Sequence, residues 1–192
     1  MRRIDGFTAQ ERIGGKEMLP AGGYIAKILD AHEKQTQTGK SMLEISFDIT
    51  AGEYAGFFKK DYAQNSSPDK KWRGVYRLFV PIGDGSERDS WSKNTLENTV
   101  WAIEESNPGY HWDWDETKLK GKNVGVLFRD KEWAYNGNTG ITTECGAFTT
   151  VEKITSKTFK PLKARMLKKQ QVQESNPFGE MQTLDDDFEL PF

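Results

Sequence analysis

The stretch "MLEISFDIT", residues 42–50, carries the clearest structural pattern in the chain. Apolar side chains stand at every second position and alternate with polar ones: Leu43, Ile45, Phe47 and Ile49. This period of two is typical of a strand with one buried and one solvated face. The preceding "GYIAKILDAHEK", residues 23–34, also indicates a strand, and the polar "QTQTGKS" between them contains Gly39, as a flexible loop requires. The sequence therefore predicts a hairpin.

Further elements follow along the chain. A third strand is expected between residues 56 and 82, either around "GFFKKDYA" or at "WRGVYRLFVPI". A helix is then predicted with Asn94 as its N-cap and Glu97 three residues later, and it should end at "NPG", residues 107–109. Its apolar face would consist of Leu96, Val100 and Ile103. The stretches "KNVGVLFRD" and "GITTECGAFTTVEKI" predict two more strands, joined by the turn-rich "YNGNTG".

This order of elements indicates the class of fold. Three strands, a helix and two strands form the order of a five-stranded Greek-key barrel of the OB type, with the helix between strands 3 and 4. Such barrels bind oligonucleotides on the face of strands 2 and 3 and through the loops that join strands 1–2 and 4–5. We therefore expect a mainly β protein with an OB-fold barrel. Another small antiparallel barrel or an α+β sandwich would also fit this order.

Charge is distributed unevenly along the chain. The 192 residues have a formal net charge of -2. Six acidic and no basic residues lie from Glu174 to the C-terminus, so residues 1–173 carry 27 basic side chains against 23 acidic ones, which is 29 less six. A weakly basic body therefore precedes an acidic tail, and body and tail are expected to have different roles.

The composition also bears on compartment. Cys145 is the one cysteine, so an internal disulfide is impossible and a reducing compartment is expected. No apolar stretch approaches the length of a membrane span, and the N-terminal "MRRIDGFTAQERIGG" lacks the apolar run of a signal peptide. We expect a cytoplasmic protein without a membrane partner.

Three segments are expected along the chain. Residues 1–155 would form the OB-fold domain that binds nucleic acid. Residues 156–173 are basic and can form one short helix with a shared apolar face of Leu162, Met166 and Leu167. Residues 174–192 are expected to be a disordered acidic tail that ends in a protein-interaction tip.

Cations and aromatic rings occur together in the body. Single-stranded nucleic acid is held by cations along its phosphates and by rings that stack on its bases. The stretches "KKWRGVYR" and "RDKEWAY" offer this mixture, and the second is expected in the loop between strands 4 and 5. The structural alternative is that the rings belong to the core and the charges to a solvated face. The predicted DNA-binding residues are Lys40, Lys70, Lys71, Trp72, Arg73, Tyr76, Arg77, Lys122, Arg129, Lys131, Trp133 and Tyr135.

Signals for catalysis are weak. The "TGKS" of residues 38–41 resembles the end of a phosphate-binding loop, but Lys34 stands at the first glycine position and a strand, not a helix, follows. Two histidines and one cysteine make neither a nucleophilic triad nor a usual zinc site plausible. In "HWDWD", residues 111–115, we expect an edge segment that packs Trp112 and Trp114 inward rather than a metal site. We predict no enzyme activity, no cofactor and no metal.

The C-terminal "DDDFELPF" resembles the tip of bacterial single-stranded DNA-binding proteins, in which an acidic run is followed by an apolar residue, proline and a final phenylalanine. Five residues match this pattern: Asp185, Asp186, Asp187, Pro191 and Phe192. The inserted "FEL", with Phe188 and Leu190, makes the tip two residues longer than the usual form. The resemblance implies that this tip recruits replication or recombination proteins, through a pocket for the last ring and basic residues for the carboxylates.

The body resembles the single-stranded DNA-binding proteins of tailed phages that infect Gram-positive bacteria. The stretches that carry this looser resemblance are "LPAGGYIAKI", "KGKNVGVLFR" and "YNGNTG". It implies an OB fold that coats single strands during replication or recombination without catalysis, in the cytoplasm of an infected bacterial cell, and it is compatible with a homo-oligomer. Two other classes stay open: an adaptor without strong DNA binding, and a metal-dependent nuclease using carboxylates such as Asp48, Glu53 and Asp61.

Overall fold

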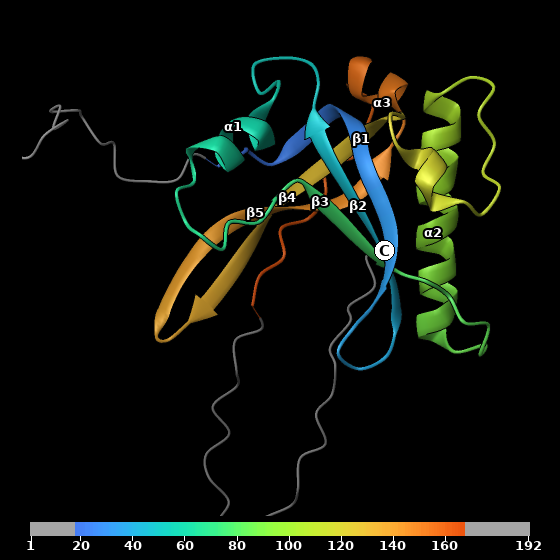
Figure 1. The fold of residues 1–192 in the computed structure, drawn as a ribbon, viewed down its shortest axis with the longest axis horizontal. Helices are drawn as coiled ribbons and strands as arrows, with labels where there is room; N and C mark the ends of the chain where they lie inside the picture. The colour runs from blue at the N-terminus through green and yellow to red at the C-terminus, as the bar shows by residue number, and fades with distance from the viewer. Residues whose placement is uncertain (1–17, 168–192) are drawn as a thin grey trace, which may run out of the picture.

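The computed structural model describes residues 18–167, and within them five antiparallel strands form one sheet in the order β3-β2-β1-β4-β5 (Figure 1). The predicted strands at residues 23–34 and 42–50 are confirmed, and the pair forms the predicted hairpin. The five strands are β1 (Gly22–Gln35), β2 (Ser41–Ile49), β3 (Val75–Phe79), β4 (Asn123–Tyr135) and β5 (Asn138–Thr149).

The alternation of β2 positions the core. Its four apolar residues between Leu43 and Ile49 are all buried, as the period of two predicts. The neighbouring strands bury side chains on the same face, because the register pairs Ile28 of β1 with Phe47 and Leu78 of β3 with Leu43. One face of the curved sheet is therefore apolar, and the alternate residues of each strand point outward.

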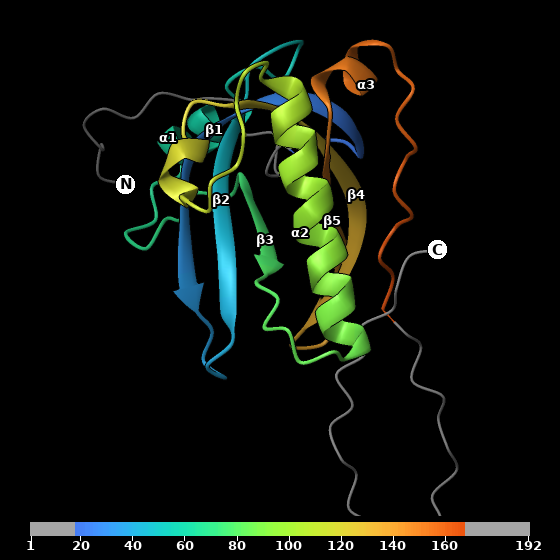
Figure 2. The same ribbon diagram turned by 90° about the vertical axis from the view of Figure 1, so that its right-hand side faces the viewer.

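A long helix lies between β3 and β4 in the chain, as predicted, but it begins earlier than expected. Helix α2 (Glu87–Ser106) is capped by Ser86, whose hydroxyl accepts a hydrogen bond from the Asp89 N–H at 3.1 Å. The prediction of Asn94 as N-cap is wrong, because Ser86, eight residues earlier in the chain, already caps the helix. Figure 2 shows α2 lying across the side of the molecule between β3 and β5.

The candidate third strand at "GFFKKDYA" is instead a helix, α1 (Phe57–Gln64), while the alternative at "WRGVYRLFVPI" contains β3. Asp48 explains the helix. Its buried carboxylate accepts hydrogen bonds from the Phe58 N–H at 3.0 Å and the Lys59 N–H at 3.3 Å. The side chain therefore satisfies donors in the first turn of α1 from a neighbouring strand.

The chain after the predicted fifth strand also differs from the expectation. β5 ends at Thr149, and residues 151–154 belong to the short helix α3 (Val151–Thr155), because Thr150 caps it by accepting from the Lys153 N–H at 3.2 Å. The short helix predicted after residue 155 is absent up to residue 167, where the described chain is extended. We call residues 158–167 the strap. It lies beside β4, where Arg165 forms a parallel bridge with Lys131.

The connection between α2 and β4 contains a 3₁₀ turn, η1 (Glu116–Leu119), and corrects one further prediction. Trp112 packs against the core as expected. Trp114 does not point inward, since it is 75% exposed and has a positive φ of 66°. Asp113 and Asp115 both form ion pairs with Lys118, so their negative charges are balanced by this lysine.

No helix among residues 18–167 has the length and apolar character needed to cross a membrane.

We predict that Asp48→Ala lowers the free energy of unfolding by about 2 kcal/mol, because it removes the cap of α1 and leaves buried N–H groups unpaired. Urea unfolding measured by circular dichroism tests this. Asp69→Ala, at an exposed position between α1 and β3, is the matched control and should change stability by less than about 0.5 kcal/mol. Equal effects of both substitutions would contradict the role of Asp48.

Candidate nucleic-acid interface

The strongest group of predicted site residues lies on the outward face of the β4–β5 hairpin. "RDKEWAY" forms the end of β4 instead of the expected loop, and the hairpin extends as a two-stranded ribbon beyond the body of the molecule (Figure 1). Alternation then places every second side chain of this stretch on one face. We call this face, together with the β5 residues paired with it, the ribbon face: Arg129, Lys131, Trp133, Tyr135, Asn138, Gly140, Thr142 and Glu144.

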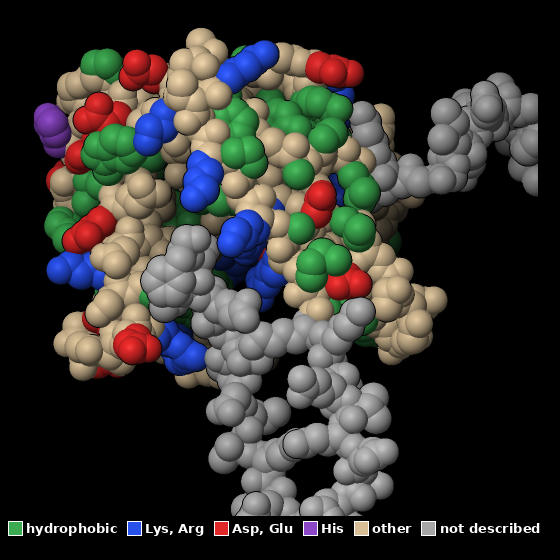
Figure 3. All heavy atoms as spheres, turned by 180° about the vertical axis from the view of Figure 1, so that it is seen from behind, with side chains coloured by type: hydrophobic (Ala, Val, Ile, Leu, Met, Phe, Trp, Pro, Cys, Tyr) green, Lys and Arg blue, Asp and Glu red, His purple; other side chains and the backbone are tan. Residues whose placement is uncertain are grey.

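Glu144 organises the cations of the ribbon face. Its Oε1 accepts hydrogen bonds from Arg129 at 3.0 and 3.1 Å, and its Oε2 lies 2.9 Å from the Lys131 Nζ. From the strap, Arg165 brings its Nη1 within 3.7 Å of the same carboxylate. Three cations thus share one anion, and the cluster keeps a positive charge. Figure 3 shows Lys and Arg side chains gathered near the middle of the face seen from behind.

Glu144 stays ionised in this setting. Burial by itself raises the pKa of Glu144, but the hydrogen bonds and charges of Lys131 and Arg129 outweigh it, and the pKa is lowered overall. The carboxylate therefore stays charged at neutral pH and holds the cations in fixed positions.

The two rings of the ribbon face are available for stacking. Trp133 is 39% and Tyr135 72% exposed. Trp133 lies over Gly140, its partner on β5, since a Cβ added at Gly140 would be 2.9 Å from the indole ring. The absence of a side chain at Gly140 therefore leaves the space that the indole ring occupies.

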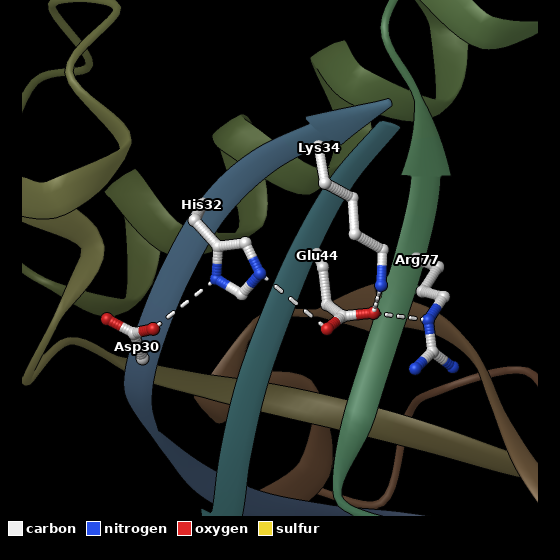
Figure 4. A network of polar contacts seen from close by, with 5 residues as sticks. All are labelled: Asp30, His32, Lys34, Glu44 and Arg77. Carbon is white, nitrogen blue, oxygen red and sulfur yellow. Dashed lines mark hydrogen bonds and ion pairs between the residues drawn. The ribbon is translucent and has the colours of Figure 1, made fainter. Parts of the chain in front are cut away.

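A second charged cluster lies on the outward face of β1, β2 and β3 (Figure 4). Its centre is Glu44 of β2, which pairs with Lys34 of β1 and Arg77 of β3. His32 lies 3.7 Å from Glu44 and 3.4 Å from Asp30. Burial raises the pKa of Glu44, but the hydrogen bonds of Lys34 and Arg77 outweigh it and lower the pKa overall. Arg77 is therefore outward-facing, as a contact residue must be, but it is already paired.

The predicted residues before β3 have mixed roles. Lys70 lies over the ring of Tyr62 of α1, with 4.5 Å between its Nζ and the ring centroid, and Lys71 is exposed. Trp72 is partly buried and donates its indole N–H to the carbonyl of Phe47 at 3.1 Å. Arg73 forms two hydrogen bonds of 2.7 Å with Asp61. Trp72 and Arg73 therefore brace this segment against the body.

Three predicted residues lie apart from these groups. Tyr76 is 6% exposed and its ring packs on that of Phe148 at 4.6 Å, so it belongs to the core and has no face free for a base. Lys40 is exposed in the loop between β1 and β2. Lys122 lies over the ring of Tyr110, with 4.2 Å between its Nζ and the ring centroid, near the start of β4.

Sequence reasoning missed several members of the site. Arg165 joins the ribbon face only because the strap runs beside β4, and no local pattern in "FKPLKARM" indicates this. Lys34 and Tyr62 were also overlooked. The period of two in "RDKEWAY" was the one available signal, because it places Arg129, Lys131, Trp133 and Tyr135 on a single face of a strand.

Other predictions are not addressed by these contacts. The interaction tip, from Asp185 to Phe192, lies outside the described residues. Within residues 18–167, no three His, Cys, Asp or Glu side chains come close enough together to hold a metal ion.

Comparison with known proteins gives no family. No family model matches the chain. No curated protein matches it either. The resemblances to single-stranded DNA-binding proteins therefore rest on the residues quoted above.

We predict that Glu144→Gln lowers the free energy of unfolding at pH 7 by about 1 kcal/mol. Because the pKa of Glu144 is lowered in the folded state, its ionised form stabilises the fold above the unfolded pKa, and this contribution is lost as pH falls through the folded pKa. In urea unfolding, the difference from the unmodified protein should therefore stay constant at pH values well above 4.5, the ordinary pKa of this carboxyl, and shrink as pH falls below it. Glu97→Gln, at an exposed pair 3.9 Å from Lys93, should have little effect. A difference that does not change with pH would contradict a charge-based role.

Proposed function

We propose that the protein binds single-stranded DNA with little dependence on sequence and protects it during replication or recombination, without catalysis. The observation that carries this proposal is the ribbon face, on which two exposed rings stand beside a cluster of three cations and one carboxylate. Stacking accepts any base, and cations accept any phosphate, so such a surface recognises the strand rather than its sequence.

The order of the strands supports an interpretation as a partly open OB-type barrel. With β1 in the centre, the sheet order leaves β3 and β5 as the two edges that a barrel would bring together. Tyr76 of β3 and Phe148 of β5 approach to a ring distance of 4.6 Å, so the two edges converge through their side chains. We propose that this convergence is the closure of a small barrel.

Spacing on the ribbon face suits successive bases. Trp133 and Tyr135 are two residues apart on one strand, which corresponds to about 7 Å, close to the separation of bases in an extended single strand. Lys131 and Arg129 continue the same row toward the body and would contact the phosphates. Bases in a duplex are stacked within the helix, and rings of this kind would not reach them.

The charged residues around Glu44, together with Lys40, extend the surface along which we propose that the DNA strand runs. OB-type barrels bind strands across β2 and β3 and between the loops that precede β2 and follow β4. Arg77 and Lys34 lie on that face here, and Lys40 lies in the loop before β2. We propose that these residues contact phosphates beyond those held by the ribbon.

Partner recruitment is the second part of the proposal. It rests on the sequence alone, through the acidic run and the final Leu190, Pro191 and Phe192. A ring anchored in a pocket and carboxylates facing basic residues would bind a replication or recombination protein.

Titration of intrinsic tryptophan fluorescence with oligo-dT tests DNA binding. We expect strong quenching by oligo-dT, a weak response to duplex DNA of equal length, and an affinity that falls as salt increases. Absence of a response to oligo-dT would overturn the coating role and leave the adaptor function in its place.

We predict that Trp133→Ala weakens oligo-dT binding by roughly 5- to 150-fold, the equivalent of about 1 to 3 kcal/mol for one stacked base. Fluorescence anisotropy of labelled oligo-dT measures the change without relying on the protein's own tryptophans. Trp114→Ala is the matched control, since Trp114 is also exposed but lies in the connection between α2 and β4. Equal losses in both variants would contradict a specific role of the ribbon face.

A further inference from the structure

β5 is an edge strand, and the turn before it defines which of its backbone groups are free. Asn136 and Gly137 both have positive φ, at 47° and 76°, so they form a two-residue turn of the I′ type between Tyr135 and Asn138. The pair that flanks such a turn exchanges two backbone hydrogen bonds, and bonded pairs then alternate with non-bonded ones along the ribbon. The residues of non-bonded pairs direct their N–H and C=O groups away from the partner strand. On β5 these are Thr139, Ile141 and Thr143.

The opposite edge of the ribbon supports this assignment. Asp130 and Glu132 belong to the same non-bonded pairs and should direct their backbone groups away from β5. There the strap binds them: the Arg165 N–H donates to the Asp130 carbonyl at 2.8 Å, and the Glu132 N–H donates to the Arg165 carbonyl at 2.9 Å. The β4 edge is therefore covered. Within residues 18–167, the backbone N–H and C=O groups of residues 139–143 form no hydrogen bond outside β4. Thr143 does donate its hydroxyl to the Leu19 carbonyl at 2.7 Å, but this contact involves the side chain of Thr143 and not its backbone groups.

Between Asn138 and Thr143, the β5 edge also lacks the features that keep edge strands apart, because the bulge of this strand lies further along, at Gly146. Natural edges are protected by lysines, prolines, bulges or short length. β5 has twelve residues, and between Asn138 and Thr143 it has no charged residue and no proline. Ile141, in the middle of this stretch, is 53% exposed. An edge of this kind is suited to pairing with another strand.

The sequence of the edge indicates what that strand is. Its outward-bonding residues read Thr, Ile, Thr in either direction, so the edge matches a second copy of itself. We propose that β5 pairs antiparallel with β5 of a second copy of this chain, around a two-fold axis at Ile141. Ile141 then faces Ile141 of the other copy, Thr139 faces Thr143, and each of these pairs exchanges two backbone hydrogen bonds.

Side chains are compatible with this register. The pairs between the bonded ones place Gly140 opposite Thr142 and Asn138 opposite Glu144, so no like charges face each other. Thr139 opposite Thr143 is a favourable cross-strand pair, and the exposed Ile141 side chains come together at the axis. The pairing lies in the plane of the sheet and does not depend on the proposed DNA binding.

The oligomeric state of the full chain tests the proposal. Sedimentation equilibrium at micromolar concentrations should show a dimer for the unmodified protein. Ile141→Lys should give a monomer, because it places two ammonium groups at the axis. Ile82→Lys, the same substitution at an isoleucine that is 75% exposed between β3 and α2, should leave the dimer intact. Circular dichroism and thermal unfolding confirm that both variants fold.

Disulfide cross-linking tests the register. Residues that face each other in a bonded antiparallel pair have Cα atoms about 5.5 Å apart, within reach of a disulfide. Ile141→Cys should therefore form a covalent dimer on mild oxidation. Thr139→Cys should not, since the two copies of position 139 would be separated by about 13 Å along the strands. The unmodified protein, oxidised under the same conditions, is the control that measures any cross-linking through the native Cys145.

Three results would overturn the proposal. The first is that the unmodified protein is a monomer throughout the concentration range. This holds also if the amide protons of Thr139, Ile141 and Thr143 resist exchange in the monomer, because another segment of the same chain would then cover the edge. The second is a dimer that persists in Ile141→Lys, since the interface would then lie elsewhere. The third is equal cross-linking of the Ile141→Cys and Thr139→Cys variants, which would show unspecific contact.

Discussion

Phe47 is the residue on which the rest of the structure depends. Its ring on β2 contacts rings from three other elements: Phe58 of α1 at 5.8 Å, Phe148 of β5 at 5.9 Å and Phe128 of β4 at 6.2 Å. Its backbone binds the chain before β3, because its N–H donates to the Gly74 carbonyl and its carbonyl accepts from the Trp72 indole. A β2 residue can meet rings of β4 and β5 across the core only if the sheet curls, so this packing is coupled to the curvature.

Curvature in turn defines the outward face. Successive side chains of a strand point to opposite faces. Because Leu43 and Ile45 are buried, Glu44 between them points outward. In the same way, burial of Phe128 directs Arg129 and every second residue after it outward. A β-bulge between Leu127 and Phe128 shifts the register of β4 against β5 just before the ribbon begins. The cations of the ribbon face therefore lie on the same side of the sheet because of how the core packs at Phe128, before the ribbon begins.

Features that depend on local sequence patterns could be predicted from the sequence. Features that depend on contacts with residues far away in the chain could not. The alternation in β2, the order of the strands and the turn at Asn136 and Gly137 could all be predicted. Helix α1 could not, because the side chain that caps it is Asp48, on a strand. Tyr76 was predicted to bind DNA because it lies among basic residues, yet period-two packing makes it a core residue. Arg165 reaches the site through pairing between strands, which no local pattern reports.

Glu144 gives a physical reason why the surface that we propose for DNA binding contains a carboxylate. Without it, Arg129, Lys131 and Arg165 would repel one another across the ribbon and would each be free to sample many rotamers. One shared carboxylate reduces the repulsion and orients all three side chains, while the cluster keeps an excess of positive charge. Glu44 has the same relation to Lys34 and Arg77 at the other side of the sheet. A phosphate that approaches either cluster meets cations that are already ordered, so less conformational entropy is lost on binding than at a surface of unpaired lysines.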